Sequence, residues 1–270
     1  MLQRPTRLAK VAGTPYLCRD FQAVMSEGFP ELPPGYGLSR GDVHVWVTPI
    51  DVPAQHLQTS IGYLSATERD KAQRFHFSAD AKRHIVGRAL AKRLLGHLLG
   101  IHPASLRFHE NAFGKPQIVD AQNVRGLRFN ISHSGEFVLV ALALGREVGV
   151  DVEQLDPRVE LEQIAARMFC RGEQHDLMSL PPGERLRGFF CCWCRKEAII
   201  KASGEGLSMA LDQFDVSLRC AEPVVLVAPA APAAEQNRWM VRDLDVGPGY
   251  AAAVAAEGLD WRVTTLQALS

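Results

Sequence analysis

LRFNISHSGEFVLVALALGREVGVDVEQL, residues 127–155, is the stretch that decides how this chain folds. Apolar, β-branched and aromatic residues fill three segments, which the turn sequences SHSGE and LGRE separate. Short connections of this kind join neighbouring antiparallel strands. The stretch therefore predicts three strands, each paired with the next along the chain.

The third of these segments, VGVDVE, carries two carboxylates. Its valines alternate with Gly149, Asp151 and Glu153, so a strand places both carboxylates on one face. A solvated strand face is the ordinary explanation for such a pair. Gly149, however, leaves room for another backbone to approach closely at this point. The pair becomes a candidate site if a further polar group meets it there.

Strand and helix patterns alternate on both sides of this stretch. VHVWVTPI alternates in the manner of a strand, and Ser65 and Glu68 have the spacing of a capping box that begins a helix. A long amphipathic helix pattern follows and ends at Gly100. A strand, a turn at FGKP and another strand come next. Further along, a second group of helical patterns precedes closing strands.

The order of strand, helices and strands occurs twice along the chain. This order predicts an α+β fold made of two similar α+β halves that are joined near residues 146–156. The segment before the first strand is rich in Pro and Gly and is expected to form an extended or loosely packed arm. We therefore divide the chain into an arm (1–42), an N-terminal subdomain (43–150) and a C-terminal subdomain (151–270).

Composition narrows the classes of function. The chain has 270 residues, and its 30 basic and 30 acidic residues leave no formal net charge, so nothing global indicates a nucleic-acid or membrane partner. The N-terminal sequence lacks the apolar core of a signal peptide or membrane span. The six cysteines lack paired metal-site spacing and are interpreted as reduced, which indicates a cytoplasmic protein.

A second stretch, WCRKEAIIKASGEGL at residues 193–207, places charges in a helix that is apolar nearly all round. Glu197 and Lys201 are four residues apart and share one face, whereas Lys196 points about 100° away. A surface ion pair is the ordinary explanation. The apolar surroundings instead indicate burial, and buried charges need partners such as a metal or a phosphate. Together with Asp151 and Glu153, Glu197 would form an oxygen site suited to Mg²⁺.

Two short turns offer donors for phosphate oxygens. FGKP presents Lys115, and NISHSG presents Ser132 and His133. An ordinary turn and a polar hairpin loop are the simpler explanations. The helical segments before these turns are rich in basic residues, which usually form a solvated face but can also hold a phosphate. The candidates among them are Lys71, Arg74, Arg83 and Arg88.

As a set, these motifs resemble the Sfp-type 4'-phosphopantetheinyl transferases. The resemblance extends from about Val43 to Glu257, and FGKP and FNISHSG stand in the expected order. Each motif alone is weak evidence for this family, whereas the set of motifs is specific for it. The family pattern W-x-x-K-E-x-x-x-K is matched by Trp193, Lys196, Glu197 and Lys201, and the pattern G-x-D-x-E by Gly149, Asp151 and Glu153.

The resemblance implies a pseudo-twofold pair of α+β subdomains with coenzyme A bound in the cleft between them. It also implies transfer of the 4'-phosphopantetheine group of coenzyme A to a serine hydroxyl of an apo acyl or peptidyl carrier protein, with release of adenosine 3',5'-bisphosphate. Mg²⁺ is the implied cofactor. The implied metal ligands are Asp151, Glu153 and Glu197, the implied phosphate contacts are Lys115, Ser132, His133 and Lys201, and the candidates for the 3'-phosphate and adenine region are Lys71, Arg74, Arg83 and Arg88.

Within this interpretation, Glu197 and Lys201 are the catalytic candidates. Lys201 would offset charge that develops on the pyrophosphate. Glu197 would act as general base, either directly or through a metal-bound water. Lys196 would serve the surroundings of Glu197 or the contact with the carrier. Fatty-acid, polyketide and nonribosomal peptide carriers all remain open as partners.

Two other functions are alternatives. A non-catalytic module that binds coenzyme A or a carrier protein would keep the basic turns but would tolerate loss of the metal carboxylates. An RNA-binding protein could use the basic helices, but these lack neighbouring aromatic residues for base stacking. We therefore expect an enzyme with no nucleic-acid or membrane partner, acting as a monomer in the cytoplasm.

Overall fold

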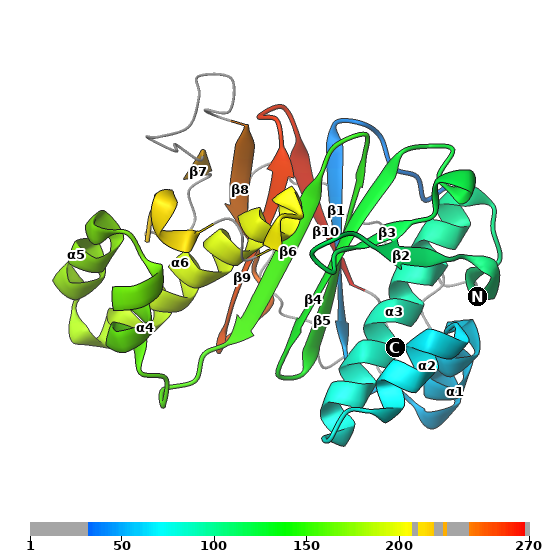
Figure 1. The fold of residues 1–270 in the computed structure, drawn as a ribbon, viewed down its shortest axis with the longest axis horizontal. Helices are drawn as coiled ribbons and strands as arrows, with labels where there is room; N and C mark the ends of the chain where they lie inside the picture. The colour runs from blue at the N-terminus through cyan, green and yellow to red at the C-terminus, as the bar shows by residue number, and fades with distance from the viewer. Residues whose placement is uncertain (1–31, 207–209, 219–223, 226–237, 268–270) are drawn as a thin grey trace, which may run out of the picture.

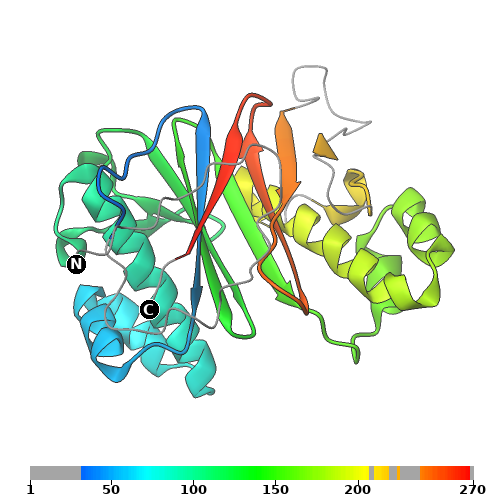
Figure 2. The same cartoon turned by 180° about the vertical axis from the view of Figure 1, so that it is seen from behind.

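The computed structural model describes residues 32–206, 210–218, 224–225 and 238–267, and it confirms the α+β class. Two four-stranded sheets stand next to each other, and the long helices cover the sheets on their outer sides (Figure 1, and from behind in Figure 2). Most of the predicted arm, residues 1–31, lies outside the described ranges. None of the described helices combines the length and the apolar character needed to cross a membrane.

The first half of the chain forms one sheet, its helices and a small hairpin. Helix α2 begins with the predicted capping box, because Ser65 Oγ accepts from the backbone N–H of Glu68 and the Glu68 carboxylate accepts from that of Ser65. Helix α3 ends at Gly100, which has the expected left-handed conformation. The elements are β1 (Asp42–Pro49), α1 (Ala54–Tyr63), α2 (Ala66–Gln73), α3 (Ser78–Leu99), β2 (Phe108–Glu110), β3 (Pro116–Ile118), β4 (Leu127–Ser134) and β5 (Phe137–Leu144).

The second half forms the other sheet and the opposite helical layer. Helix α6 contains the stretch WCRKEAIIKAS and ends, as predicted, at Gly204, which is left-handed. The last strand, β10, leaves this half and joins the first sheet in parallel with β1. The elements are β6 (Val148–Gln154), α4 (Leu161–Met168), α5 (Arg171–Ser179), α6 (Pro182–Ser203), β7 (Val224–Val225), β8 (Trp239–Asp243), β9 (Tyr250–Glu257) and β10 (Arg262–Gln267).

The two halves repeat one topology. The strand order is β1-β5-β4 in the first sheet and β6-β9-β8 in the second, and all of these neighbours are antiparallel. In each half the long helix, α3 or α6, follows the first strand. This correspondence is the pseudo-twofold arrangement of two α+β units. Because β10 belongs to the first sheet, a division of the chain at residue 150 would separate this strand from its sheet.

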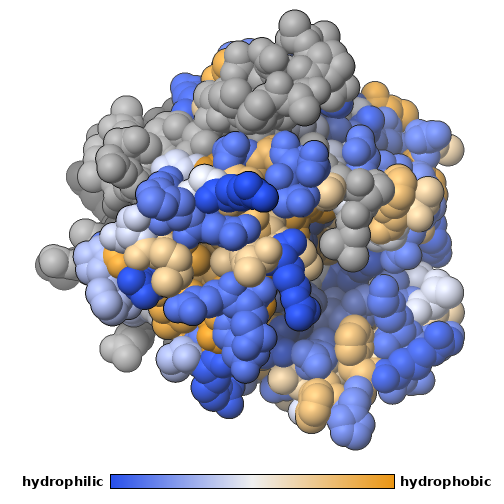
Figure 3. All heavy atoms as spheres, turned by 60° about the vertical axis from the view of Figure 1, so that its left-hand side comes forward, coloured by the Kyte–Doolittle hydropathy of each residue, from blue (hydrophilic) through white to orange (hydrophobic). Residues whose placement is uncertain are grey.

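Buried apolar residues form three layers of core. One layer packs α3 against the first sheet, another packs α6 against the second sheet, and the third lies between the sheets, where Val45 and Leu139 face Val150 and Val254. The face in Figure 3 is mainly hydrophilic, with hydrophobic residues in small groups. The end of the predicted arm belongs to this packing, because Leu38 is 6% exposed and the Tyr36 hydroxyl accepts from Trp46 Nε1 at 3.0 Å. Residues 32–41 are therefore not loosely attached.

The predicted pairing of the second and third strands of the opening stretch is wrong. Strands β4 and β5 pair as expected, but β6 pairs with β9 in the other sheet. The reason is that both edges of β5 are already occupied, one by β4 and the other by β1. The turn LGRE, in which Gly145 is left-handed, therefore carries the chain from one sheet into the next.

Gly149 allows β6 to pack directly against α6. A Cβ atom at this position would overlap the carbonyl oxygen of Ala198 and the backbone nitrogen of Ala202, both of which belong to α6. The close backbone approach that the sequence predicts is therefore present, and its partner is the helix that carries Glu197 and Lys201. Strand and helix bring their charged residues together through this contact.

We predict that Gly149→Ala will destabilise the protein by about 1–3 kcal/mol or more, the usual cost of forcing extra volume into a packed interior. Thermal or urea unfolding measures the loss. Gly183→Ala, in the first turn of α6, is the matched control, since an added Cβ there meets nothing within 4 Å. Equal stability of the Gly149→Ala and Gly183→Ala variants would contradict the proposed close contact.

Candidate active site

Strands β4 and β6 and helix α6 bring three polar side chains together at the junction of the two halves. Asp151, on β6, is only 2% exposed. Its Oδ1 atom lies 2.5 Å from Lys201 Nζ and accepts the Ser132 hydroxyl proton at 2.9 Å. Lys201 Nζ also donates to Ser132 Oγ at 3.1 Å. The first half of the chain thus supplies one member of a site whose charged members come from the second half.

Glu153 and Glu197 place two more carboxylates in this environment, and both are half-buried. Burial raises the pKa of Glu153, and the neighbouring charge of Asp151 raises it further, against the hydroxyl of Ser134 and the charge of Lys201. Burial also raises the pKa of Glu197, where Lys201 opposes the shift and Asp151 adds to it. The three predicted metal carboxylates therefore influence one another, and such a group favours a bound cation.

Asp151 shows where a cation would be held. Its second oxygen, Oδ2, is buried and has no hydrogen-bond partner among the described residues. A buried carboxylate oxygen without a partner is costly, so such atoms normally bind a donor or a metal. Hard oxygen donors are the ligands that Mg²⁺ prefers. By their chemistry, Asp151, Glu153 and Glu197 therefore suit a magnesium ion, which would draw together carboxylates whose oxygens are not all within 4.8 Å of one another in this structure.

Lys201 is held in its charged form. Burial alone would lower its pKa, but the carboxylates of Asp151, Glu197 and Glu153 outweigh burial and keep the pKa above its usual value. The side chain is still 30% exposed, so its ammonium can reach a ligand in solvent. Lys201 is thus a permanent positive charge beside the three carboxylates.

A group of basic side chains lies next to Lys201. Partial burial lowers the pKa of His133, and the charges of Lys201 and Arg83 lower it further, whereas Asp80 opposes them. Arg83 is fixed in place, because its Nε donates to Gly135 O at 2.8 Å and its NH1 to Asp80 Oδ1 at 2.6 Å. Three basic groups with one acidic neighbour form a suitable place for a phosphate.

A second basic group forms around Glu110 at the end of β2. Lys71 Nζ lies 3.7 Å, and Arg88 NH2 3.5 Å, from the same carboxylate oxygen of Glu110. The structure therefore brings together two of the residues expected near the 3'-phosphate. Arg74 is exposed at the C-cap of α2, where its backbone N–H donates to Lys71 O at 3.2 Å.

Lys115 has structural partners. Its ammonium is 2.8 Å from Glu147 Oε2 and donates to Ala202 O, near the end of α6, at 2.8 Å. Asn111, in the same turn, donates to Gly204 O at 2.8 Å. The FGKP turn thus binds carbonyl groups that the end of a helix leaves without intrahelical partners. This geometry favours a role for Lys115 in docking the β2–β3 hairpin on α6 rather than in binding a phosphate.

Lys196 is not placed for one of the two roles expected from the sequence, the contact with the carrier. It is fully buried, lies 2.8 Å from Glu173 Oε1, and donates to the carbonyl oxygens of Leu211 and Phe214 at 2.7 and 2.5 Å. Its ammonium also lies 4.4 Å from the centre of the Phe214 ring. Lys196 therefore anchors the segment after α6 and cannot contact a carrier protein.

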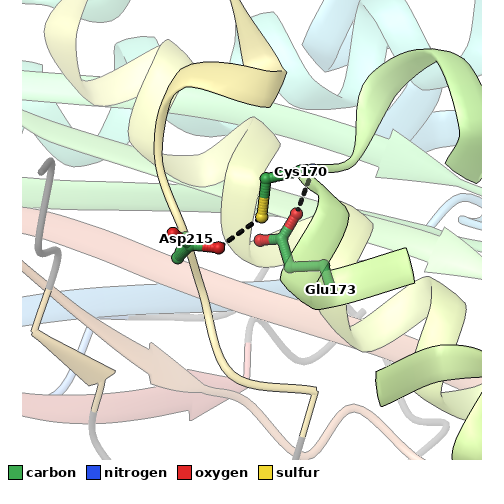
Figure 4. Close-up of side chains that lie close together, drawn as sticks. All are labelled: Cys170, Glu173 and Asp215. Carbon is green, nitrogen blue, oxygen red and sulfur yellow. Dashed lines mark hydrogen bonds between the residues drawn. The ribbon is translucent and has the colours of Figure 1, made fainter. Parts of the chain in front are cut away.

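Glu173 also belongs to a cluster of possible metal ligands, which Figure 4 shows. Cys170, Glu173 and Asp215 lie close enough to share a metal ion. However, Glu173 already pairs with Lys196 and accepts the backbone N–H of Cys170 at 2.9 Å and that of Val216 at 2.8 Å. Burial and a hydrogen bond to Asp215 raise the pKa of the Cys170 thiol to about 12. The cluster is a helix cap joined to an ion pair.

The cysteines partly follow the expectation. Cys170, Cys192 and Cys194 carry free thiols. Cys191 is disulfide-bonded, so the interpretation of all six cysteines as reduced is wrong for this residue.

Comparisons with known proteins agree with this geometry. Residues 51–144 match a family model described as the N-terminal part of 4'-phosphopantetheinyl transferase, and residues 147–255 match that of the 4'-phosphopantetheinyl transferase superfamily. The 4'-phosphopantetheinyl transferase HetI of Nostoc sp. strain PCC 7120 is 36% identical over 85% of this chain and 94% of its own length. The chain belongs to the 4'-phosphopantetheinyl transferase superfamily.

Two relatives from Bacillus subtilis support the same membership. The 4'-phosphopantetheinyl transferase ffp is 34% identical over 78% of this chain and 91% of its own length. The 4'-phosphopantetheinyl transferase Sfp of strain 168 is 32% identical over 74% of this chain and 85% of its own length. The Sfp-type resemblance drawn from the motifs is therefore confirmed, and the comparisons do not favour the non-catalytic alternative.

Sequence reasoning about this transferase missed three polar residues with clear roles. Ser134 donates to Glu153 Oε2 at 2.8 Å, Glu147 pairs with Lys115, and Glu173 pairs with Lys196. The sequence contains signals for two of these residues, Ser134 and Glu173. Ser134 continues the alternation of Asn130 and Ser132, and Glu173 stands at capping-box spacing from Cys170.

We predict that Lys196→Met will destabilise this transferase by about 3–5 kcal/mol, because Glu173 is left as an uncompensated buried charge. Urea unfolding measures the loss. The double variant Lys196→Met with Glu173→Gln should recover part of it, since the charge is removed and the amide oxygen still accepts a backbone N–H. A Lys196→Met protein as stable as the wild type would show that the ion pair does not hold this region.

Proposed function

We propose that this chain transfers the 4'-phosphopantetheine group of coenzyme A to a serine hydroxyl of an apo acyl or peptidyl carrier protein and releases adenosine 3',5'-bisphosphate. One observation carries the proposal. Lys201 pairs with the buried Asp151 at 2.5 Å, its charge interacts with Glu197 and Glu153, and His133 feels the charges of Lys201 and Arg83. This is the charge pattern that a metal-bound pyrophosphate requires. The names of the relatives support the same reaction.

Asp151, Glu153 and Glu197 would hold Mg²⁺, which neutralises charge on the pyrophosphate when it is bound. Lys201 would donate to a pyrophosphate oxygen, so that its charge counters the charge that develops as the phosphate–oxygen bond breaks. His133 and Arg83 would hold phosphate oxygens from the other side. The protein then supplies position and charge, which account for most of the rate in phosphoryl transfer.

Glu197 is the proposed general base. A base works best when its pKa is brought toward the working pH, and burial raises the pKa of this carboxyl group. The carrier serine would give its proton to Glu197, directly or through a water, as its oxygen attacks the phosphate next to the pantetheine. The attacking serine belongs to the partner, so the chain needs no nucleophile of its own.

The remaining parts of the proposal concern the surroundings of the reaction. Lys71, Arg74 and Arg88 would receive the 3'-phosphate and adenine region of coenzyme A, whereas we propose Arg83, the fourth candidate for this region, for the pyrophosphate because its charge acts on His133. A fatty-acid, polyketide or nonribosomal peptide carrier would be the partner. We propose that the protein acts in the cytoplasm as a monomer without nucleic acid.

The deciding experiment incubates the full chain with coenzyme A, Mg²⁺ and a panel of purified apo carrier proteins, and reads the carriers by intact mass. A mass increase by one phosphopantetheine group, lost in chelator, is the expected result. If no carrier gains this mass, while coenzyme A still binds, the non-catalytic module replaces the transferase as the proposed function.

We predict that Asp151→Asn will lower the rate of carrier modification by roughly 100-fold or more, as happens when one preorganised charged group is removed from an active site. The amide keeps the shape of the side chain, so the fold should persist, which circular dichroism checks. Undiminished transfer by this variant at limiting Mg²⁺ would remove Asp151 from the metal site.

We predict that the protein binds coenzyme A about 10-fold to 100-fold more tightly than dephospho-coenzyme A, because charge-assisted hydrogen bonds to the 3'-phosphate contribute about 1.5–3 kcal/mol. Calorimetry at one salt concentration measures both affinities. Lys71→Gln should reduce this preference, whereas Lys82→Gln, another exposed lysine that we place outside the site, should retain it. Equal affinities of the wild type for the two ligands would refute this assignment.

A further inference from the structure

One edge of β6 is bonded to side chains instead of to another strand. β6 pairs with β9 along its inner edge and ends the second sheet, and β4 ends the first sheet. Three backbone N–H groups of β6 donate across the junction to three side chains of β4. These pairs, which we call the β4–β6 seam, are Val150 N to Asn130 Oδ1 at 3.0 Å, Val152 N to Ser132 Oγ at 3.4 Å and Gln154 N to Ser134 Oγ at 3.0 Å.

Two members of the seam also bind carboxylates of the metal site. Ser132 Oγ donates to Asp151 Oδ1 at 2.9 Å, and Ser134 Oγ donates to Glu153 Oε2 at 2.8 Å. A hydroxyl group has one proton and two lone pairs. Because a backbone N–H occupies one lone pair, the proton is left to point at the carboxylate. The seam therefore fixes the place of each hydroxyl and the direction in which it donates.

We infer that Ser134 is a positioning residue for Glu153, so that the first half of the chain orients a metal carboxylate carried by the second half. The inference rests on the metal site of the proposed function. Carboxylates that bind metals are usually held by a further hydrogen bond, and loss of that bond typically costs 10-fold to 100-fold in metal affinity. Ser134 tests this idea more cleanly than Ser132, because Ser132 also contacts Lys201.

Asn130 provides a matched control within the same seam. It accepts a backbone N–H of β6, as Ser134 does, at the same distance of 3.0 Å. Asn130 Oδ1 accepts this N–H, and no carboxylate among the described residues bonds to it. Loss of Asn130 should therefore weaken the junction of the two sheets without altering a metal ligand directly.

The experiment measures the binding of Mn²⁺ alone to the full chain, by electron paramagnetic resonance of the free ion, and thermal unfolding in chelator. Ser134→Ala should weaken Mn²⁺ binding about 10-fold to 100-fold. Asn130→Ala should bind Mn²⁺ as the wild type does. Both variants should unfold at a lower temperature in chelator, since each leaves one backbone N–H without its acceptor. Ser134→Thr, which keeps the hydroxyl, should restore the Mn²⁺ affinity.

The outcomes separate this inference from the proposed function. Wild-type affinity in Ser134→Ala would overturn the positioning role and leave the metal site intact. Equal weakening in Ser134→Ala and Asn130→Ala would also overturn it, because the seam would then act only through general stability. A wild-type protein that binds no Mn²⁺ would overturn the metal site and the inference together. Asn130→Ser, which retains an acceptor, replaces Asn130→Ala if that variant does not fold.

Discussion

The arrangement of the site depends on a strand edge that is buried without a partner strand. Strand β6 ends the second sheet at the junction of the two halves, where N–H groups left without acceptors would be costly. Asn130, Ser132 and Ser134 supply the acceptors, one for every second residue of β6. Short side chains can do this only when the two strands keep their register. The requirement to satisfy the β6 backbone therefore holds the two halves in one position, and this position brings Lys201, Asp151 and Ser132 into contact.

Electrostatics separates three structural lysines from Lys201, the lysine that we propose for the reaction. Four lysines of the described chain pair with carboxylates within 3 Å: Lys92 with Glu68, Lys115 with Glu147, Lys196 with Glu173 and Lys201 with Asp151. The first three also donate to backbone carbonyls and have almost no exposed surface. Lys201 is 30% exposed and donates to side chains, not to any carbonyl among the described residues. A lysine bound to carbonyls cannot leave them without cost, whereas Lys201 can turn toward a ligand.

The sequence predicted those features that depend on neighbours along the chain or on a motif. Three features were predicted correctly because each follows from local geometry. They are the capping box at Ser65, the glycine at the end of α6 and the close packing at Gly149. The three carboxylates proposed as metal ligands were identified as candidates through spacing and resemblance. The partners of Lys115 and Lys196 were not, since Glu147 and Glu173 approach them only through tertiary folding. The same is true of β6, whose partner β9 lies about a hundred residues away.

The repeat explains why the chain builds one such junction and not two. In the correspondence of the halves, β1 matches β6 and β8 matches β4. The symmetry therefore predicts a second junction, in which β1 and β8 would lie edge to edge as β6 and β4 do. Both of these edges are covered. Strand β10 pairs with the outer edge of β1, and β7 pairs with the outer edge of β8. Of the strands that correspond in the two halves, β4 and β6 have no further strand on their outer edges in the described part of the chain, and there the seam and the charged side chains take its place.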